Sequence, residues 1–459
     1  MNAKSFLDRR QFLQATIGGC GFCAGGLHSQ LKLAAAQTQS GVYAPQRLHH
    51  PARAKQLIIV FLTGGFSHVE TFDYKPQLNA DHGKTAMYRG NAQKIMGSQF
   101  RFDPYGQSGL MMSELFSNLG SVADELCMIR TMKTDIVEHF QATLAMHTGS
   151  ATIPMPSIGG WLSYGLGTLN KNLPAYTVFC ELLPYAGAQN WDSLFLPPIH
   201  QGVHLLPGDD PIPNLNPLAR STTLAELQQK MLHDVNQMHW KQRQHDAQLI
   251  ARDQTNQVAR GMMRVAPEVL NANQETASTL QMYGVEAGDT RSFAWQCLAA
   301  RRLVERGVRV VEIIESGSHS NWDSHANMQE HVPKAERVDK PLAALIRDLK
   351  QRGMLDETLI AICTEFGRTP VTFNSTGREH HADAFSCLLA GGGIQGGITY
   401  GETDPYGIST VDKPCHVHDY HATILHLMGI DHERLTYRYA GRDFRLTDVH
   451  GNVMKEIII

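Results

Sequence analysis

The sequence predicts an α/β protein built on a mostly parallel central sheet. Two continuous apolar runs, at residues 56–62 and 358–363, have the composition of parallel strands that are buried on both faces. A third run, at residues 308–314, directly follows a helical pattern at residues 291–306. This alternation of helix and strand is typical of a parallel sheet covered by helices.

Length and composition fit a globular protein of this class. The chain has 459 residues, of which 42% are hydrophobic and 19% are charged. The net charge is −3, from 41 basic and 44 acidic residues, which argues against a nucleic-acid-binding protein and against one that lies on an anionic membrane. The 23 histidines are numerous and clustered, and this clustering directs attention to metal binding.

Residues 1–36 have the pattern of a twin-arginine signal peptide. Arg9 and Arg10 precede a weakly hydrophobic stretch at residues 15–27, and an alanine triplet at residues 34–36 provides a cleavage site. The stretch is too short and too rich in glycine for a transmembrane span. The alternative is a soluble N-terminal helix, but the order of these features favours export by the twin-arginine translocase, to the periplasm or outside the cell.

One domain is expected over residues 55–459, after a polar and turn-rich lead-in at residues 37–54. Within this domain, residues 185–290 depart from the alternation of strand and helix. Proline-rich turns there lead into a long polar helical pattern at residues 222–259. We interpret this region as a mostly helical insert, and a lid over the functional site is its expected role.

The remaining elements follow from the same patterns. Strands are predicted at residues 126–131, 175–182 and 384–389, and helices at residues 139–149, 154–166, 335–352 and 419–430.

The turn after the first strand contains two glycines and two candidate metal ligands. Gly64 and Gly65 allow a ligand or an ion to approach the backbone at the carboxyl end of a strand, where open α/β sheets place their sites. His68 and Asp73 follow and are the candidate ligands. Each has a simpler alternative, as a surface histidine and as the cap of a turn.

Two further strands end in polar loops. The strand at residues 358–363 ends near Glu365, and the strand at residues 308–314 leads to Asp323 and His325, a carboxylate and an imidazole within reach of one ion. A loop after residue 376 contains four more polar residues: Arg378, Glu379, His380 and His381. Taken singly, each of these residues could be ordinary. Together, five potential ligands from three loops predict a metal site: Asp323, His325, Glu365, His380 and His381.

The helix at residues 139–149 begins with a histidine that belongs to the same region. His139, Thr143 and His147 share one helical face, and the helix follows a strand, so His139 is expected near the strand ends. The alternative is that these histidines only satisfy neighbouring polar groups. Mixed imidazole and carboxylate ligands suit Zn²⁺ or Mn²⁺ better than Ca²⁺. We expect one or two ions, with candidate ligands His68, Asp73, Asp323, His325, Glu365, His380 and His381.

Four segments resemble the alkaline phosphatase and sulfatase superfamily. They are QLIIVFLTGG, MHTG, PLAALIRDLKQRGMLDETLIAICTEFGRTP and DYHATILHLMGI, in the expected order between residues 56 and 430. The chain is most similar to an exported bacterial family, the domain of unknown function 1501 family, marked by the motifs SH-x-x-TFD, W-D-S-H, TEFGRTP and GREH. The resemblance implies a three-layer α/β/α fold like that of alkaline phosphatase.

The resemblance also implies site roles, and the departures from it are informative. Where sulfatases carry a pair of aspartates after the first strand, this chain has Gly64 and Gly65, and His139 stands at the position of the nucleophile. We therefore expect catalysis by metal-activated water, or by His139 as a phosphohistidine nucleophile. Arg368 or Arg378 would hold the anionic group of the substrate.

Two functions are compatible with these observations. The first is an exported metal-dependent hydrolase acting on a small phosphate or sulfate ester. The second is a non-catalytic relative that keeps the fold and binds an anionic ligand or partner, in line with the missing nucleophile and the missing aspartate pair.

Overall fold

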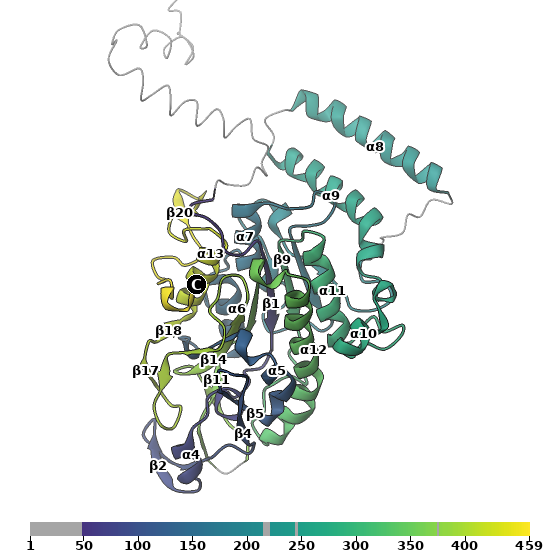
Figure 1. Ribbon diagram of the computed structural model, residues 1–459. Helices are drawn as coiled ribbons and strands as arrows, with labels where there is room; N and C mark the ends of the chain where they lie inside the picture. The colour runs from purple at the N-terminus through teal and green to yellow at the C-terminus, as the bar shows by residue number, and fades with distance from the viewer. Residues whose placement is uncertain (1–47, 214–220, 244–246, 374–375) are drawn as a thin grey trace, which may run out of the picture. The chain divides into compact units, whose positions relative to one another are not determined.

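The computed structural model describes residues 48–213, 221–243, 247–373 and 376–459 (Figure 1). These residues lie in one compact unit, Pro45–Ile459. The predicted signal peptide and residues 37–47 of the lead-in lie outside the described residues. No helix of the described part combines the length and the apolar composition that crossing a membrane requires.

A nine-stranded sheet forms the centre of this unit. Its strands run in the order β15 (Ile398–Tyr400), β6 (Leu126–Lys133), β14 (Phe385–Ala390), β10 (Thr358–Cys363), β1 (Gln56–Phe61), β9 (Val310–Ile314), β7 (Tyr176–Cys180) and β8 (Val203–Leu205), and β18 (Cys415–His416) also pairs with β6. All neighbouring strands are parallel except β14, which is antiparallel to β10 and β6. The predicted mostly parallel α/β sheet is confirmed.

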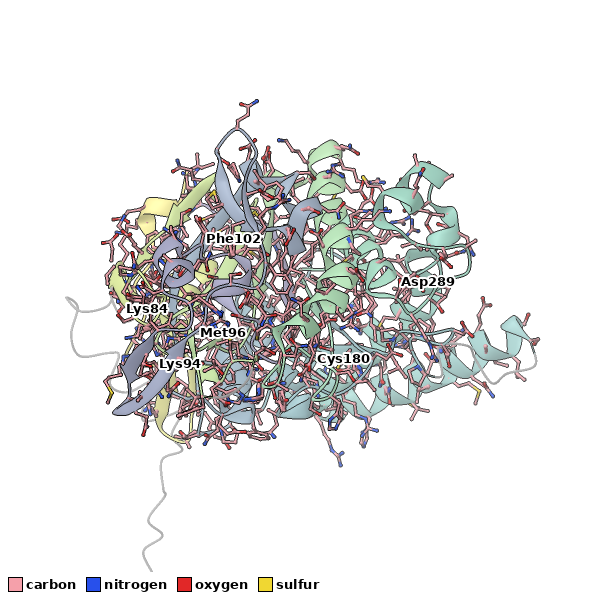
Figure 2. All side chains as sticks on the ribbon, turned by 90° about the horizontal axis from the view of Figure 1, so that it is seen from below. Lys84, Lys94, Met96, Phe102, Cys180 and Asp289 are labelled. Atoms are coloured by element: carbon pink, nitrogen blue, oxygen red, sulfur yellow. The ribbon has the colours of Figure 1, made fainter. Side chains whose placement is uncertain are left out.

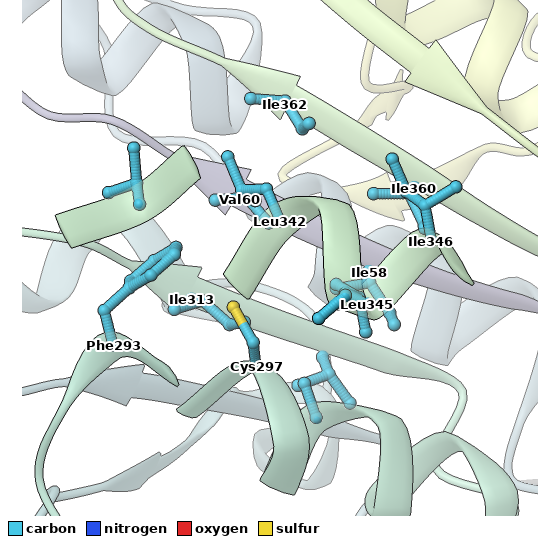
Figure 3. Close-up of a cluster of buried hydrophobic side chains, with 14 of the residues drawn as sticks. Ile58, Val60, Phe293, Cys297, Ile313, Leu342, Leu345, Ile346, Ile360 and Ile362 are labelled. Carbon is cyan, nitrogen blue, oxygen red and sulfur yellow. The ribbon is translucent and has the colours of Figure 1, made fainter. Parts of the chain in front are cut away.

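Helices cover both faces of the sheet because successive side chains of each buried strand point to opposite faces. Ile58 and Val60 of β1 pack against α11 (Phe293–Glu305) and α12 (His331–Gln351), as Figure 3 shows. On the other face, the alternate β1 residues pack with α7 and α13. The helices of that second face are α6 (His139–Thr148), α7 (Ile158–Leu166) and α13 (Val417–Leu427). The result is the expected three-layer arrangement.

The region predicted as an insert is more varied than its sequence pattern indicates. The expected long helix is two helices, α8 (Thr222–Gln242) and α9 (Ala247–Val269), and α10 (Ala277–Tyr283) follows. Strand β8, at the edge of the central sheet, also comes from this region. Seen from below, Lys84 and Lys94 lie on the opposite side of the unit from Asp289, which follows α10 (Figure 2).

The remaining elements are short and connect or extend the main strands and helices. The remaining helices are α3 (His68–Thr71), α4 (Pro76–Ala80) and α5 (Ser117–Gly120), and the small sheets contain β2 (Thr85–Tyr88), β3 (Asn91–Ile95) and β12 (Val371–Thr372); β4 (Phe102–Tyr105) and β5 (Leu110–Ser113); β11 (Gly367–Arg368) and β13 (His380–His381); β16 (Glu402–Thr403) and β17 (Thr410–Asp412); β19 (Tyr437–Tyr439) and β20 (Arg442–Phe444). The β11–β13 pair places Arg368 opposite His380, beyond the end of β10.

Candidate metal centre

Three side chains from distant parts of the chain meet at the carboxyl ends of β10, β1 and β9. They are His139 at the start of α6, Asp323 in the loop after β9, and His380 at the start of β13. One potential ligand atom from each lies within 4.8 Å of the others. The carboxyl ends of parallel strands share one edge, and this explains why residues so far apart in sequence converge here.

Glu365 contacts the imidazole of His139 on its Nδ1 side, opposite the nitrogen that faces Asp323. Its Nδ1 lies 2.7 Å from Glu365 Oε1, and its Nε2 lies 3.3 Å from Asp323 Oδ2. The Glu365 carboxylate is in turn fixed by the backbone N–H of Gly64, which donates to Oε1 at 2.8 Å. The ring of Tyr185 stacks on His139 with centroids 4.3 Å apart. This support orients Nε2 of His139 toward Asp323.

The imidazole of His380 is oriented by a backbone carbonyl. Its Nδ1 lies 2.6 Å from the oxygen of Val137, which can only accept, so Nδ1 carries the proton. Its Nε2, 3.2 Å from Asp323 Oδ1, then presents a lone pair to the cluster in the neutral ring. The ring also packs on Phe366, with centroids 4.5 Å apart.

Asp323 is anchored by a buried guanidinium. Arg368 Nη2 donates to Asp323 Oδ1 at 2.5 Å and also to the carbonyl oxygen of Gly64, and Arg368 Nε donates to that of Gly65 at 2.8 Å. Gly64 has φ +109°, and a Cβ there would lie 2.6 Å from the backbone nitrogen of Trp322. Glycine at position 64 is therefore required for the loops of β1 and β9 to approach so closely.

The charges of these groups are strongly coupled. Burial alone would raise the pKa of Asp323, but the neighbouring imidazoles of His139 and His380 and the guanidinium of Arg368 hold it well below its usual range. Burial would lower the pKa of His139, yet the neighbouring carboxylates of Asp323 and Glu365 raise it. Burial dominates at His380 and lowers its pKa despite Asp323. The two carboxylates thus stabilise the protonated form of His139.

The donor set fits a divalent metal ion. Two imidazoles and a carboxylate converge, and the far nitrogen of each ring is occupied by a fixed partner, which is the usual arrangement around metal-binding histidines. His139 Nε2 is buried and has no aligned hydrogen-bond partner. A cation could replace the proton on this nitrogen.

Other predicted site residues lie around this cluster. His325 Nε2 is 2.9 Å from Asp323 Oδ1 and 3.1 Å from His380 Nε2, and its Nδ1 is 2.9 Å from Glu379 Oε2. Glu365 contacts the cluster through His139.

The structure does not bring His68 and His381 to this cluster. They stack on each other, with centroids 5.9 Å apart. His68 Nε2 lies 2.9 Å from the carbonyl oxygen of Gly407, and His381 contacts Tyr88 Oη at 3.0 Å and the carbonyl oxygen of Ile408 at 2.7 Å. Burial lowers the pKa of His68 to about 4 and that of His381 to about 3, so both rings are neutral.

Asp73 and Arg378 form buried ion pairs elsewhere. Asp73 lies 3.1 Å from Lys75 Nζ. Arg378 donates to Glu70 Oε1 from Nε at 2.8 Å and from Nη2 at 2.6 Å, and its Nη1 donates to the carbonyl oxygen of Thr369 at 2.9 Å. The guanidinium is fully buried, so its partners belong to the protein itself.

A second carboxylate–imidazole pair, which the sequence patterns did not predict, involves the other end of α6. His147 Nε2 lies 2.7 Å from Glu312 Oε1, and Tyr176 Oη donates to Glu312 Oε2. His147 Nδ1 donates to the carbonyl oxygen of Thr143 at 2.7 Å. All three side chains are buried. In the sequence, Glu312 could have been recognised as an acidic residue within the apolar run that forms β9.

The fold and the site define an α/β protein with an imidazole–carboxylate centre at the carboxyl edge of its sheet. The chain belongs to the family described as a protein of unknown function (DUF1501), whose model matches residues 54–458, and the predicted family is thereby confirmed. Comparison with curated proteins gives no match.

Several solved structures resemble this one at low similarity. A Vibrio parahaemolyticus protein in the alkaline phosphatase superfamily is 11% identical, with a TM-score of 0.39 over 87% of this chain and 74% of that one. The PsFucS1 sulfatase from Pseudoalteromonas sp. is 12% identical, with a TM-score of 0.36 over 88% and 71%. The alkaline phosphatase from the Antarctic bacterium TAB5 is 10% identical, with a TM-score of 0.32 over 82% and 98%.

Proposed function

We propose that this protein is an exported, metal-dependent hydrolase of small phosphate or sulfate esters. The observation that carries the proposal is the convergence of His139, Asp323 and His380, each with a second partner that fixes its orientation. The sequence resemblance to phosphatases and sulfatases supports the substrate class. The twin-arginine pattern at residues 1–36 supports export.

The residues divide into ligands and groups that orient them. His139, Asp323 and His380 would bind the ion, Zn²⁺ or Mn²⁺, and Glu365 would keep Nδ1 of His139 protonated so that Nε2 faces the ion. Arg368 fixes Asp323 and offsets its charge. A divalent ion at such a site supplies Lewis-acid chemistry, polarising the ester and making water nucleophilic near neutral pH.

Of the histidines at the cluster, His325 is placed to transfer protons. Its side chain is 40% exposed, and it lies between Asp323 and Glu379. We assign it the transfer of a proton to the leaving group. Arg378 has no role at the site in this proposal, because its donors are directed to Glu70 and to backbone carbonyls. Water is favoured over His139 as nucleophile, since both nitrogens of that ring face carboxylates.

The second candidate function is binding without catalysis. One observation favours it: the two arginines predicted to hold an anionic substrate, Arg368 and Arg378, are both fully buried and donate to protein acceptors. Recognition of an anion would then use groups other than these two guanidiniums.

The test is elemental analysis of the protein purified without chelator, followed by assays with p-nitrophenyl phosphate and p-nitrophenyl sulfate. We expect bound zinc or manganese in the wild-type protein, little in Asp323→Asn, and hydrolysis that stops on chelation. The matched control is Asp73→Asn, a buried acid outside the cluster, which should keep its metal. Metal without hydrolysis of either ester would support the binding role, and a metal-free folded wild type would overturn the hydrolase proposal.

A further inference from the structure

Helix α8 exposes an apolar stripe and turns its polar face inward. Its five stripe residues have exposed fractions between 44% and 62%: Leu224, Leu227, Met231, Val235 and Met238. At 100° per residue they fall within about 80° of the helix circumference, so they form one continuous line. Contiguous exposed apolar surface is typical of sites that bind another molecule.

Residues on the opposite face of α8 are partly covered by the rest of the unit. Half-buried positions on that side are Ala225, Gln229, His233, Asn236 and Gln237. The helix contacts α9, where Gln229 Nε2 lies 3.7 Å from Met263 Sδ. Figure 1 shows α8 beside α9 and away from the central sheet. The apolar stripe therefore faces away from the unit's own core.

The spacing of the stripe reads the same in both directions. Its intervals are three, four, four and three residues, centred on Met231. In an antiparallel pair of α8 helices related by a two-fold axis at Met231, Leu224 of one copy would face Met238 of the other, and Leu227 would face Val235. Intervals of three and four residues are those of helices that pack side by side, and a two-fold axis requires one surface to be complementary to itself.

Charge also fits a second copy better than a membrane. The charged residues at Glu226, Lys230, Asp234 and Lys241 sum to zero, whereas helices that bind anionic membranes are rich in lysine and arginine. Lys230 and Asp234 flank the same edge of the stripe. In the antiparallel pair, Lys230 of one copy and Asp234 of the other would differ by about 3 Å along the helix axis, which allows two symmetric ion pairs.

We infer that α8 is a homodimerisation helix, which pairs with α8 of a second copy of this chain in antiparallel orientation about Met231. The inference is independent of the proposed hydrolase function. One helix of 21 residues supplies a small interface, so the dimer should dissociate in the micromolar range.

The test combines sedimentation with crosslinking of the full-length protein. The wild type should shift from monomer to dimer over micromolar concentrations, whereas Met231→Glu, which places two carboxylates at the axis, should stay monomeric with an unchanged thermal midpoint. Met231→Cys should form a disulfide-linked dimer on oxidation. The matched control, Glu226→Cys on the same helix outside the stripe, should not. The described native cysteines are all buried and add little background.

Each contrary result would overturn the inference. These results are a wild type that stays monomeric, a Met231→Glu protein that dimerises like the wild type, and equal crosslinking of the two cysteine variants. Binding of the monomer to phosphatidylglycerol vesicles through α8 would also overturn it, in favour of a membrane surface.

Discussion

The two ends of α6 carry the same chemical pair in two different settings. His139 at the first residue and His147 two turns later each lie 2.7 Å from a glutamate oxygen, of Glu365 and of Glu312 respectively. The remaining nitrogen of His147 is bonded to the carbonyl oxygen of Thr143. The remaining nitrogen of His139 faces Asp323 and the candidate metal centre. What such a pair can do therefore depends on the partner of the other imidazole nitrogen.

The largest expected effect is on the pair formed by His147 and Glu312, called the inner pair below. Glu312→Ala leaves His147 and Tyr176 buried without their acceptor, and breaking a buried pair in this way costs about 3–5 kcal/mol of unfolding free energy. Urea unfolding monitored by circular dichroism measures this loss. Metal content per folded molecule should not change. If Glu312→Ala removed metal as thoroughly as Asp323→Asn, the distinction between the two pairs would be wrong.

At the candidate metal centre, loss of a ligand should lower metal affinity before it affects stability. Asp323→Asn keeps an oxygen acceptor for Arg368 but removes the charge at the centre of the cluster. We expect affinity for zinc to fall by more than about 100-fold, which is beyond the effect usual for loss of an outer partner. Competition with a chromogenic chelator gives the affinity. An unchanged zinc affinity would exclude Asp323 as a ligand.

A smaller effect is expected from replacing Glu365, which contacts Nδ1 of His139. Glu365→Gln keeps the shape of the acceptor and removes its charge, so zinc affinity should fall by about 10- to 100-fold. Glu379→Gln is the control, since Glu379 is exposed and reaches the cluster only through His325. Equal losses in the two variants would mean that Glu365 does not orient His139.

The smallest effect is a pH dependence at the inner pair. Burial alone would lower the pKa of His147, but Glu312, the Thr143 carbonyl and more distant Glu365 raise it above its ordinary value. A raised pKa in the folded state stabilises the protein below the unfolded-state pKa of about 6.5, and this contribution disappears as pH rises through the folded-state pKa.

The stability difference between wild type and Glu312→Gln should therefore be full below about pH 6.5 and shrink as pH rises through the raised folded-state pKa of His147. Urea titrations at several pH values measure it. A difference that grows with pH would show that His147 is neutral in the folded protein.

Sequence patterns predicted the sheet well because its strands are buried on both faces. The continuous apolar run of β1 leaves little choice of structure, and the carboxyl ends of β1, β9 and β10 had to meet at one edge. The reversed direction of β14 and the β8 strand inside the insert could not be predicted, because both depend on pairing partners that are distant in sequence.

The site was predictable as a region but not as a set of bonds. The sequence indicates that Asp323, His380 and Glu365 follow strand ends, but it does not indicate which nitrogen of each imidazole faces inward. The pairing of Arg378 with Glu70 spans 308 residues, and adjacent histidines at 380 and 381 point to different partners because side chains alternate along β13. Such choices are made by tertiary contacts.

Arg368 has a consequence for the charge balance of the candidate metal centre. Its guanidinium is tied to the chain and held by the carbonyl oxygens of Gly64 and Gly65, so Asp323 keeps a positive neighbour whether or not a metal is present. Emptying the site then need not expose an unbalanced negative charge to the protein interior. We therefore expect the loops that carry Asp323 and Arg368 to keep their arrangement in metal-free protein, so that adding or removing a metal ion would not require unfolding.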